Sequence, residues 1–231
     1  MMCSDATDIQ AALAEFSTCE ISDALIKLGS PHGGHIPDIH MLSPADSTTR
    51  LCGPAYTVQM VLGSDTSAPK LSAHFVDTAP EGSVVVISAP HRVKNAVWGG
   101  LMTAGAQSRG ARGVVISGRC RDLAEHRAVD FPVFARGHST LGQSPFTRPS
   151  AVNVAVTIDS PDVSQEDFPA VEVNPGDWMV ADEDGVVCIP QELALNVIGL
   201  ARKGREVDER CMTDIKAGKG VQETFKKHRG K

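Results

Sequence analysis

The chain has 231 residues, of which 42% are hydrophobic and 22% are charged, a composition that is ordinary for a soluble globular protein. Its formal net charge of −6 argues against a nucleic-acid partner, because nucleic-acid binding depends on clustered Lys and Arg. No apolar run approaches the ~20 residues of a membrane-spanning helix, and the polar N-terminus is unlike a signal or transit peptide. We therefore expect no membrane association and a cytoplasmic location.

The first 62 residues predict two helices, a loop and a strand. Apolar residues at helical spacing indicate helices over 5–16 and 19–28, the second ended by Gly29. Residues 30–50 are rich in Pro, Gly, His and Asp and predict a loop, in which histidines 32, 35 and 40 match no metal-binding spacing. A strand follows over 56–62.

A short helix over 70–77 and a buried strand over 83–88 precede a glycine turn that begins at residue 99. There, Gly99 and Gly100 lead into a helix over 101–109. A helix N-terminus presents unpaired N–H groups, and glycines let a ligand approach them. The residues Gly99, Gly100, Leu101 and Met102 are therefore candidates to bind a carboxylate or a phosphate.

The next strand, over 114–116, is followed by a polar loop over 117–122 and a helix over 123–127. Loops at the carboxyl ends of strands commonly hold ligand groups in α/β sheets. Arg119 and Arg121 offer planar cationic groups for an oxyanion, and Asp122 offers oxygen to a hard cation. A simpler alternative is that Asp122 only caps the following helix. Cys120 is either a nucleophile or, as we favour, an incidental thiol.

The second half predicts mostly strands, over 131–136, 151–158, 171–173, 178–181 and 186–189. Residues 137–150 and 159–169 read as polar connections. The acidic turn over 182–185 indicates a hairpin, because it lacks the spacing of a calcium-binding loop. From residue 191 to about 217 one apolar stripe predicts a long helix. Its acids Glu206, Asp208 and Glu209 are either solvated or directed to a neighbouring subunit.

This pattern favours one α/β domain with a layered sheet over residues 1–190, followed by a helical tail over 191–231. The six cysteines form no C-x-x-C pair, and no Cys/His cluster has zinc spacing. With no secretory signal, we expect no disulfides.

Several blocks in the same order resemble the RraA-like family, which includes the regulator of ribonuclease E activity and 4-hydroxy-4-methyl-2-oxoglutarate aldolase/oxaloacetate decarboxylase enzymes. The principal blocks are GGLMTAGAQSRGARGVVISGRCRD at 99–122, FPVFARG at 131–137 and NPGDWMVADEDGVVCIP at 174–190. FSTCEISDAL at 16–25 and GPAYTV at 53–58 are also similar. The resemblance implies a β/β/α sandwich like the swivelling phosphohistidine domain, assembled into trimers or hexamers with sites between subunits.

For the aldolase branch the resemblance also implies roles for particular residues. The turn Gly99–Met102 would hold the carboxylate of a 2-oxo acid, and Arg121 would bind the carbonyl that becomes an enolate. Asp122 would anchor Mg²⁺ or Mn²⁺, largely through water. An acid from the next subunit's C-terminal helix, among Glu206, Asp208 and Glu209, would complete the shell.

The resemblance departs from the bacterial aldolase pattern at Gly100, where that pattern has an aspartate that helps a water move a proton. The proton-transfer group is therefore unassigned, with His91, His126 or a water as candidates. The first hypothesis is a metal-dependent lyase acting on a pyruvyl substrate. The alternatives are a non-catalytic regulator that binds a protein partner, and a family member recruited to a specialised biosynthetic step.

Overall fold

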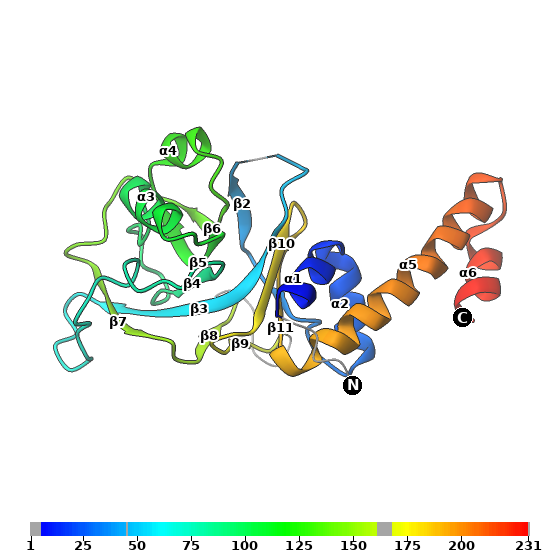
Figure 1. The fold of residues 1–231 in the computed structure, drawn as a ribbon, viewed down its shortest axis with the longest axis horizontal. Coiled ribbons are helices and arrows are strands. Elements are labelled where there is room, and N and C mark those ends of the chain that lie inside the picture. Colours follow the sequence, from blue (N-terminus) through cyan, green and yellow to red (C-terminus); the bar gives the residue numbers. More distant parts are fainter. Residues whose placement is uncertain (1–5, 45, 161–167, 231) are drawn as a thin grey trace.

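The computed structural model describes residues 6–44, 46–160 and 168–230, and a mixed β-sheet forms its centre (Figure 1). The strands are β1 (His35–Ile36), β2 (His40–Ser43), β3 (Leu51–Leu62), β4 (Val84–Ser88), β5 (Gly113–Cys120), β6 (Val133–His138), β7 (Thr147–Val152), β8 (Val156–Ile158), β9 (Val171–Val173), β10 (Trp178–Asp182) and β11 (Gly185–Ile189). The sheet order is β1-β11-β10-β3-β4-β5-β6-β2, and β7 also pairs with β3. β8 and β9 form a separate antiparallel pair.

Helices cover the sheet at two places and extend beyond it at the C-terminus (Figure 1). The helices are α1 (Ala6–Ala14), α2 (Thr18–Lys27), α3 (Gly100–Ser108), α4 (Leu123–Ala128), the 3-10 turn η1 (Gln191–Leu193), α5 (Ala194–Lys216) and α6 (Val221–Arg229). α1, α2 and the start of α5 pack against β10 and β11, whereas α3 and α4 lie over the parallel strands.

The long strand β3 joins the two parts of the sheet. Its first residues pair antiparallel with β10, and residues 55–59 pair parallel with β4. β4, β5 and β6 continue this parallel order. The carboxyl ends of three adjacent strands therefore open at one edge, which is where α/β sheets usually place ligand groups.

The central strands are apolar throughout because both of their faces are buried. In β4, Val85 and Ile87 pack in the cluster under α3 and α4, whereas Val84 and Val86 face the opposite side. On that side they meet Val156, Ile158, Val171 and Val173 of the β8–β9 pair. The result is the layered β/β/α arrangement that was expected from the resemblance.

Three expected elements differ from those observed because tertiary contacts override local sequence. No helix forms over 70–77, where Tyr56 Oη donates a hydrogen bond to the Phe75 carbonyl at 3.0 Å. The expected strand 151–158 is broken at Asn153, whose φ is 52° and whose N–H bonds to the Thr57 carbonyl. The expected loop 30–50 contains the short strands β1 and β2.

The strand after the glycine turn is also longer than its apolar residues suggest. β5 continues through Cys120, because it regains its pairing with β6 after an irregularity between Ile116 and Arg119. Residues 117–120, expected in a loop, therefore belong to a strand. Only Arg121 and Asp122 lie in the turn itself.

The expected C-terminal helix is confirmed in α5, which projects from the body of the molecule (Figure 1). The basic end of the chain, within the expected helical tail, forms α6. Asp214 holds α6 against α5 by accepting hydrogen bonds from Lys227 and His228, both at 2.9 Å. The boundary at residue 190 and the interface role of the tail stay predictions. Among the described residues, no helix is long and apolar enough to cross a membrane.

Candidate functional site

The glycine turn before α3 and the end of β5 lie side by side. Trp98 forms a parallel bridge with Cys120, and Arg121 N donates to the Trp98 carbonyl at 2.9 Å. This pairing continues the sheet by one short segment. It therefore brings Gly99 and the start of α3 next to Arg121 and Asp122, which are more than 20 positions later in the chain.

Asp122 connects the N-termini of α3 and α4. Its backbone is left-handed, with φ 63° and ψ 43°, and its side chain makes no capping hydrogen bond to α4. Instead, Asp122 Oδ2 accepts a hydrogen bond from Gly100 N at 2.9 Å. The simpler expectation, that Asp122 only caps the following helix, is therefore wrong for the side chain.

Both glycines of the turn lie in close contact with acidic side chains. A Cβ on Gly99 would lie 2.6 Å from Asp122 Oδ2, and a Cβ on Gly100 would lie 1.6 Å from Glu125 Oε2. Gly99 itself has an extended backbone with φ −150°. The Glu125 carboxylate, on the first turn of α4, thus occupies the space that a side chain at position 100 would take.

Arg121 lies beside Asp122 and faces the 137–150 segment. Its Nε is 3.5 Å from Asp122 Oδ2, and its side chain is 45% exposed. A Cβ on Gly142 would lie 2.8 Å from Arg121 Nη1, so the guanidinium is close to that segment. An exposed guanidinium beside a carboxylate can bind the oxygen of an anionic ligand.

A pocket of about 240 Å³ opens where these groups meet. Its lining includes Gly99, Leu101, Met102, Arg121 and Asp122, which the sequence proposed. Gly100, also proposed, is not a lining residue, and its N–H donates to Asp122. Other lining residues are His74, Ala96, Val97, Trp98, Gln143 and Ser144. The sequence missed this second group, because nothing local indicates that the 137–150 segment returns to the glycine turn.

One backbone donor of α3 remains available at the pocket. Gly100 N donates to Asp122, and Met102 N donates to the Gly99 carbonyl at 3.0 Å. Leu101 N donates to no acceptor in the described part of the chain. Because the N-terminus of a helix carries partial positive charge, this N–H is suited to a carboxylate oxygen.

A buried network supports the pocket from beneath. Trp98 Nε1 donates to Thr103 Oγ1 at 2.8 Å, and that hydroxyl lies 2.9 Å from His126 Nδ1. His126 is fully buried, and burial lowers its pKa from the usual value for a histidine. His126 therefore packs between α3 and α4 and is not among the residues that line the pocket.

Other candidates raised by the sequence lie away from the pocket. His91 pairs with Asp159 at 2.8 Å, in a separate cavity. Cys120 is buried, and burial raises the pKa of its thiol to about 11, which favours the incidental thiol over the nucleophile. The described ranges contain no cluster of three or more His, Cys, Asp or Glu that could hold a metal ion.

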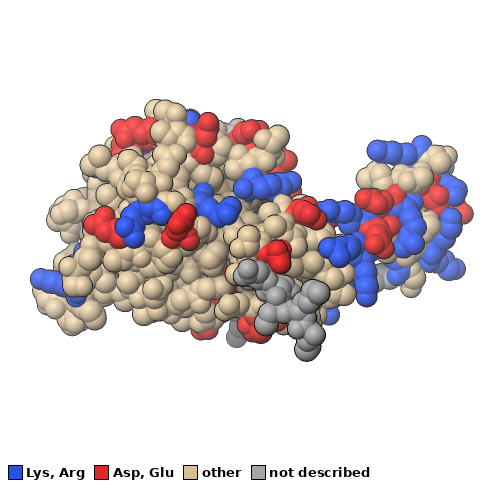
Figure 2. Space-filling view, viewed as in Figure 1, with Lys and Arg blue, Asp and Glu red and all other residues tan. Residues whose placement is uncertain are grey.

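The acids of α5 do not reach Asp122 within one chain, because α5 projects away from α3 and α4 (Figure 1). Asp208 is bound to Arg229 at 2.7 Å. Glu206 and Glu209 line a surface hollow with Asp214 and His228, and within the described residues they form no ion pair. Figure 2 shows acidic and basic side chains interleaved over this hairpin of α5 and α6.

The chain is similar in sequence to proteins of one family. A family model described as "RraA-like: Aldolase/RraA" matches residues 18–188. Protein DlpA of Legionella pneumophila is 28% identical over 91% of this chain, which spans 32% of that protein's length. A Halalkalibacterium halodurans protein named "Putative 4-hydroxy-4-methyl-2-oxoglutarate aldolase" is 31% identical, and the match covers 73% of each chain.

The fold is also found among solved structures. The crystal structure of an uncharacterized protein from Pseudomonas syringae pv. tomato matches with a TM-score of 0.78 and 31% identity. The match covers 94% of this chain and 96% of that one. It confirms the mixed α/β fold with a multi-stranded sheet and a C-terminal helix.

Proposed function

This chain belongs to the RraA-like family, and from that premise we propose that it is a divalent-metal-dependent lyase acting on a pyruvyl substrate. The reaction is aldol cleavage or decarboxylation through a pyruvate enolate, with 4-hydroxy-4-methyl-2-oxoglutarate or oxaloacetate as the substrate. The observation that carries the proposal is the meeting of Arg121, Asp122 and the Leu101 N–H at one pocket.

The carboxylate of Asp122 fits a hard cation such as Mg²⁺ or Mn²⁺, which prefers oxygen ligands. Its Oδ2 is engaged by Gly100 N, whereas its Oδ1 accepts no hydrogen bond from the described residues. The side chain is 34% exposed, so water and substrate can reach it. A bound cation would act as a Lewis acid on the 2-oxo acid and favour negative charge on its carbonyl oxygen.

The remaining groups of the pocket would each bind a different part of a pyruvyl substrate. The Leu101 N–H, at the positive end of α3, would bind the carboxylate. The Arg121 guanidinium would donate hydrogen bonds to the carbonyl oxygen as the enolate charge develops. A fixed donor at such an oxygen typically contributes a factor of about 10²–10³ in turnover.

Glu125 is the group that we assign to proton transfer. Its carboxylate lies over Gly100 at the start of α3, and its side chain is exposed to water. In aldol cleavage it would accept the hydroxyl proton of the substrate through a water and return it to the enolate carbon. Decarboxylation needs no such base, because loss of CO₂ itself generates the enolate.

This assignment gives a selective test. Glu125→Gln should lower the exchange of pyruvate methyl protons with solvent about 10²-fold or more, because general bases contribute factors of this size. Oxaloacetate decarboxylation by the same variant should stay within a few-fold of wild type. Equal loss of both activities, or loss of neither, would contradict the assignment.

A second carboxylate would strengthen the binding of a cation at Asp122. Asp122 is the one acid among the described residues that line the pocket, and α5 of the same chain lies far from it. We propose a homo-oligomer, a trimer or a hexamer, in which α5 of a neighbouring copy supplies this acid. Glu206 and Glu209 are better candidates than Asp208, because Asp208 is already paired with Arg229.

The alternative function is a non-catalytic regulator that binds a protein partner. Leu101, which lines the pocket, is 81% exposed. Phe146, which is 45% exposed, follows the lining residues Gln143 and Ser144 in the sequence. Such apolar exposure suits a protein contact. A regulator would have no need for an open Asp122 oxygen beside Arg121, and we therefore favour the lyase.

The deciding assay is release of pyruvate from oxaloacetate and from 4-hydroxy-4-methyl-2-oxoglutarate, with Mg²⁺ or Mn²⁺ and with excess chelator. The proposal expects turnover that chelator abolishes and that Arg121→Ala lowers at least 10²-fold. Arg109→Ala, on the exposed far end of α3, is the matched control. Metal-independent binding to a protein, without turnover of either substrate, would favour the regulator.

A further inference from the structure

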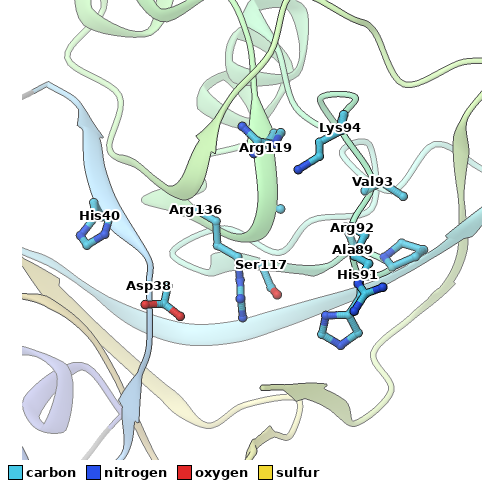
Figure 3. Close-up of a pocket in the computed structure, with 12 residues that line it drawn as sticks. Asp38, His40, Ala89, His91, Arg92, Val93, Lys94, Ser117, Arg119 and Arg136 are labelled. Atoms are coloured by element: carbon cyan, nitrogen blue, oxygen red, sulfur yellow. The ribbon is translucent and has the colours of Figure 1, made fainter. Parts of the chain in front are cut away.

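A second cavity, of about 340 Å³, opens at the same edge of the sheet but shares no lining residue with the pocket at Asp122. It is bounded by the segment 89–94 after β4, by the end of β5 and by β6, with Asp38 and His40 closing one side (Figure 3). Its volume is in the range of small-molecule sites.

The lining of this cavity is strongly basic, although the whole chain carries a net charge of −6. Asp38 is the single acidic residue among the lining residues of the described chain. The basic ones are His40, His91, Arg92, Lys94, Arg119 and Arg136. Like charges that gather in one hollow repel each other unless an anion is present, so this composition points to an anionic ligand.

Some of these basic groups already have protein partners. His91 pairs with Asp159, and Arg136 Nη2 donates to the Asp159 carbonyl. Arg119 Nη1 donates to the His138 carbonyl at 3.0 Å, and among the described residues its guanidinium pairs with no carboxylate. Lys94 makes no hydrogen bond or ion pair within the described part of the chain. Figure 3 shows Lys94 extending toward Arg119 over the cavity.

A hydroxyl without a protein partner is also available at this cavity. Ser117 lines the cavity, is only 7% exposed, and donates no hydrogen bond to any described residue. Its oxygen keeps contact with solvent, so the hydroxyl can donate to a ligand that enters the cavity.

We propose that this cavity binds a small dianion, a metabolite that carries a phosphate group or a pair of carboxylates. Arg119 supplies the planar fork that matches such oxyanions, Lys94 supplies a second positive charge, and the Ser117 hydroxyl donates from the floor. The ligand site is separate from the lyase pocket. The two nevertheless share β5, since Arg119 faces this cavity and Arg121 faces the other.

The test is calorimetric titration of the full-length, metal-free protein with inorganic phosphate, pyrophosphate and malonate in separate arms. The proposal expects saturable binding of at least one of these dianions, and the arms distinguish a phosphate from a dicarboxylate ligand. Lys94→Gln and Arg119→Gln should each weaken binding about tenfold or more, since each removes a charged hydrogen bond. Arg109→Gln is the matched surface control.

The same titration on Arg121→Ala separates the two pockets. Binding that persists in Arg121→Ala and is lost in Lys94→Gln supports the proposal. Loss of binding in Arg121→Ala overturns the proposal. So does the absence of saturable binding to wild type up to about 10 mM anion, a concentration above the usual range of KM values. Unchanged melting temperatures of the variants show that they are folded, and Arg119→Lys, which keeps the charge, should retain part of the affinity.

Discussion

Replacing Asp122 by Asn separates the charge of this side chain from the shape of the turn. Asn tolerates the left-handed backbone that Asp122 adopts at φ 63°, and its amide oxygen can still accept the hydrogen bond from Gly100 N. The ion pair with Arg121 is partly exposed on both sides, so its loss should cost about 0–1 kcal/mol of stability. The fold should therefore survive.

The same substitution should strongly impair turnover. The proposed metal site loses its one anionic ligand from this chain, and removal of such an electrostatic group costs about 3–4 kcal/mol in the transition state. This corresponds to a decrease of roughly 10²–10³-fold in kcat. Asp122→Ala should lose activity as well, but it should also lower the free energy of unfolding by roughly 2.5–5 kcal/mol, through the lost hydrogen bond and the left-handed backbone.

Pyruvate release from oxaloacetate and urea denaturation of the same preparations measure the two effects. Asp77→Asn, on an exposed turn, is the matched control for the loss of one carboxylate. Wild-type turnover in a folded Asp122→Asn protein would refute the role of the carboxylate. Unfolding of Asp122→Asn would show instead that the charge mainly stabilises the turn.

Further predictions concern assembly, stability and pH. Folded Asp122→Asn subunits mixed with subunits that carry both Glu206→Gln and Glu209→Gln should regain activity when subunits exchange, because a hybrid interface restores one intact site. Native mass spectrometry measures the exchange, and a mixture that exchanges but stays inactive would contradict a shared site. Asp182 is fully buried and accepts hydrogen bonds from Thr18 N and Oγ1 at 2.9 and 2.6 Å, beside Arg50 at 3.1 Å, so Asp182→Ala should cost about 3–5 kcal/mol in urea denaturation. Because burial lowers the pKa of His126, the unfolded chain binds a proton more readily, and stability should fall as the pH drops below about 6.5. His126→Gln should weaken this pH dependence in urea denaturation at pH 7.5 and 5.5, and an unchanged dependence would exclude His126 as its source.

Much of the candidate site could be predicted from local sequence because its parts are contiguous. The glycine turn, the strand after it and the pair Arg121–Asp122 lie within 24 residues, and their spacing alone places them at a helix start and a strand end. The structure adds the direction of the Asp122 side chain, which turns from its own helix toward Gly100. A pattern of residue types holds no information on that choice.

The parts that sequence missed depend on contacts between distant segments. The position of Glu125 over Gly100 requires the crossing of α4 and α3, and the basic cavity combines the segments after β4, β5 and β6. Likewise the position of α6 against α5 depends on contacts of Lys227 and His228 with Asp214, which the local sequence does not indicate. Ion pairs and packing between elements decide these features, and neither has a local periodicity.

The central claim is that Arg121, Asp122 and a divalent metal stabilise a pyruvate enolate, and it can be tested without knowledge of the physiological substrate. The direct measurement is exchange of the methyl protons of pyruvate with D₂O, followed by proton NMR, with Mg²⁺ or with chelator. The account predicts exchange that requires both the metal and Arg121, and that is reduced roughly 10²-fold or more in Arg121→Ala. Exchange that proceeds equally with chelator, or equally in Arg121→Ala, would contradict it.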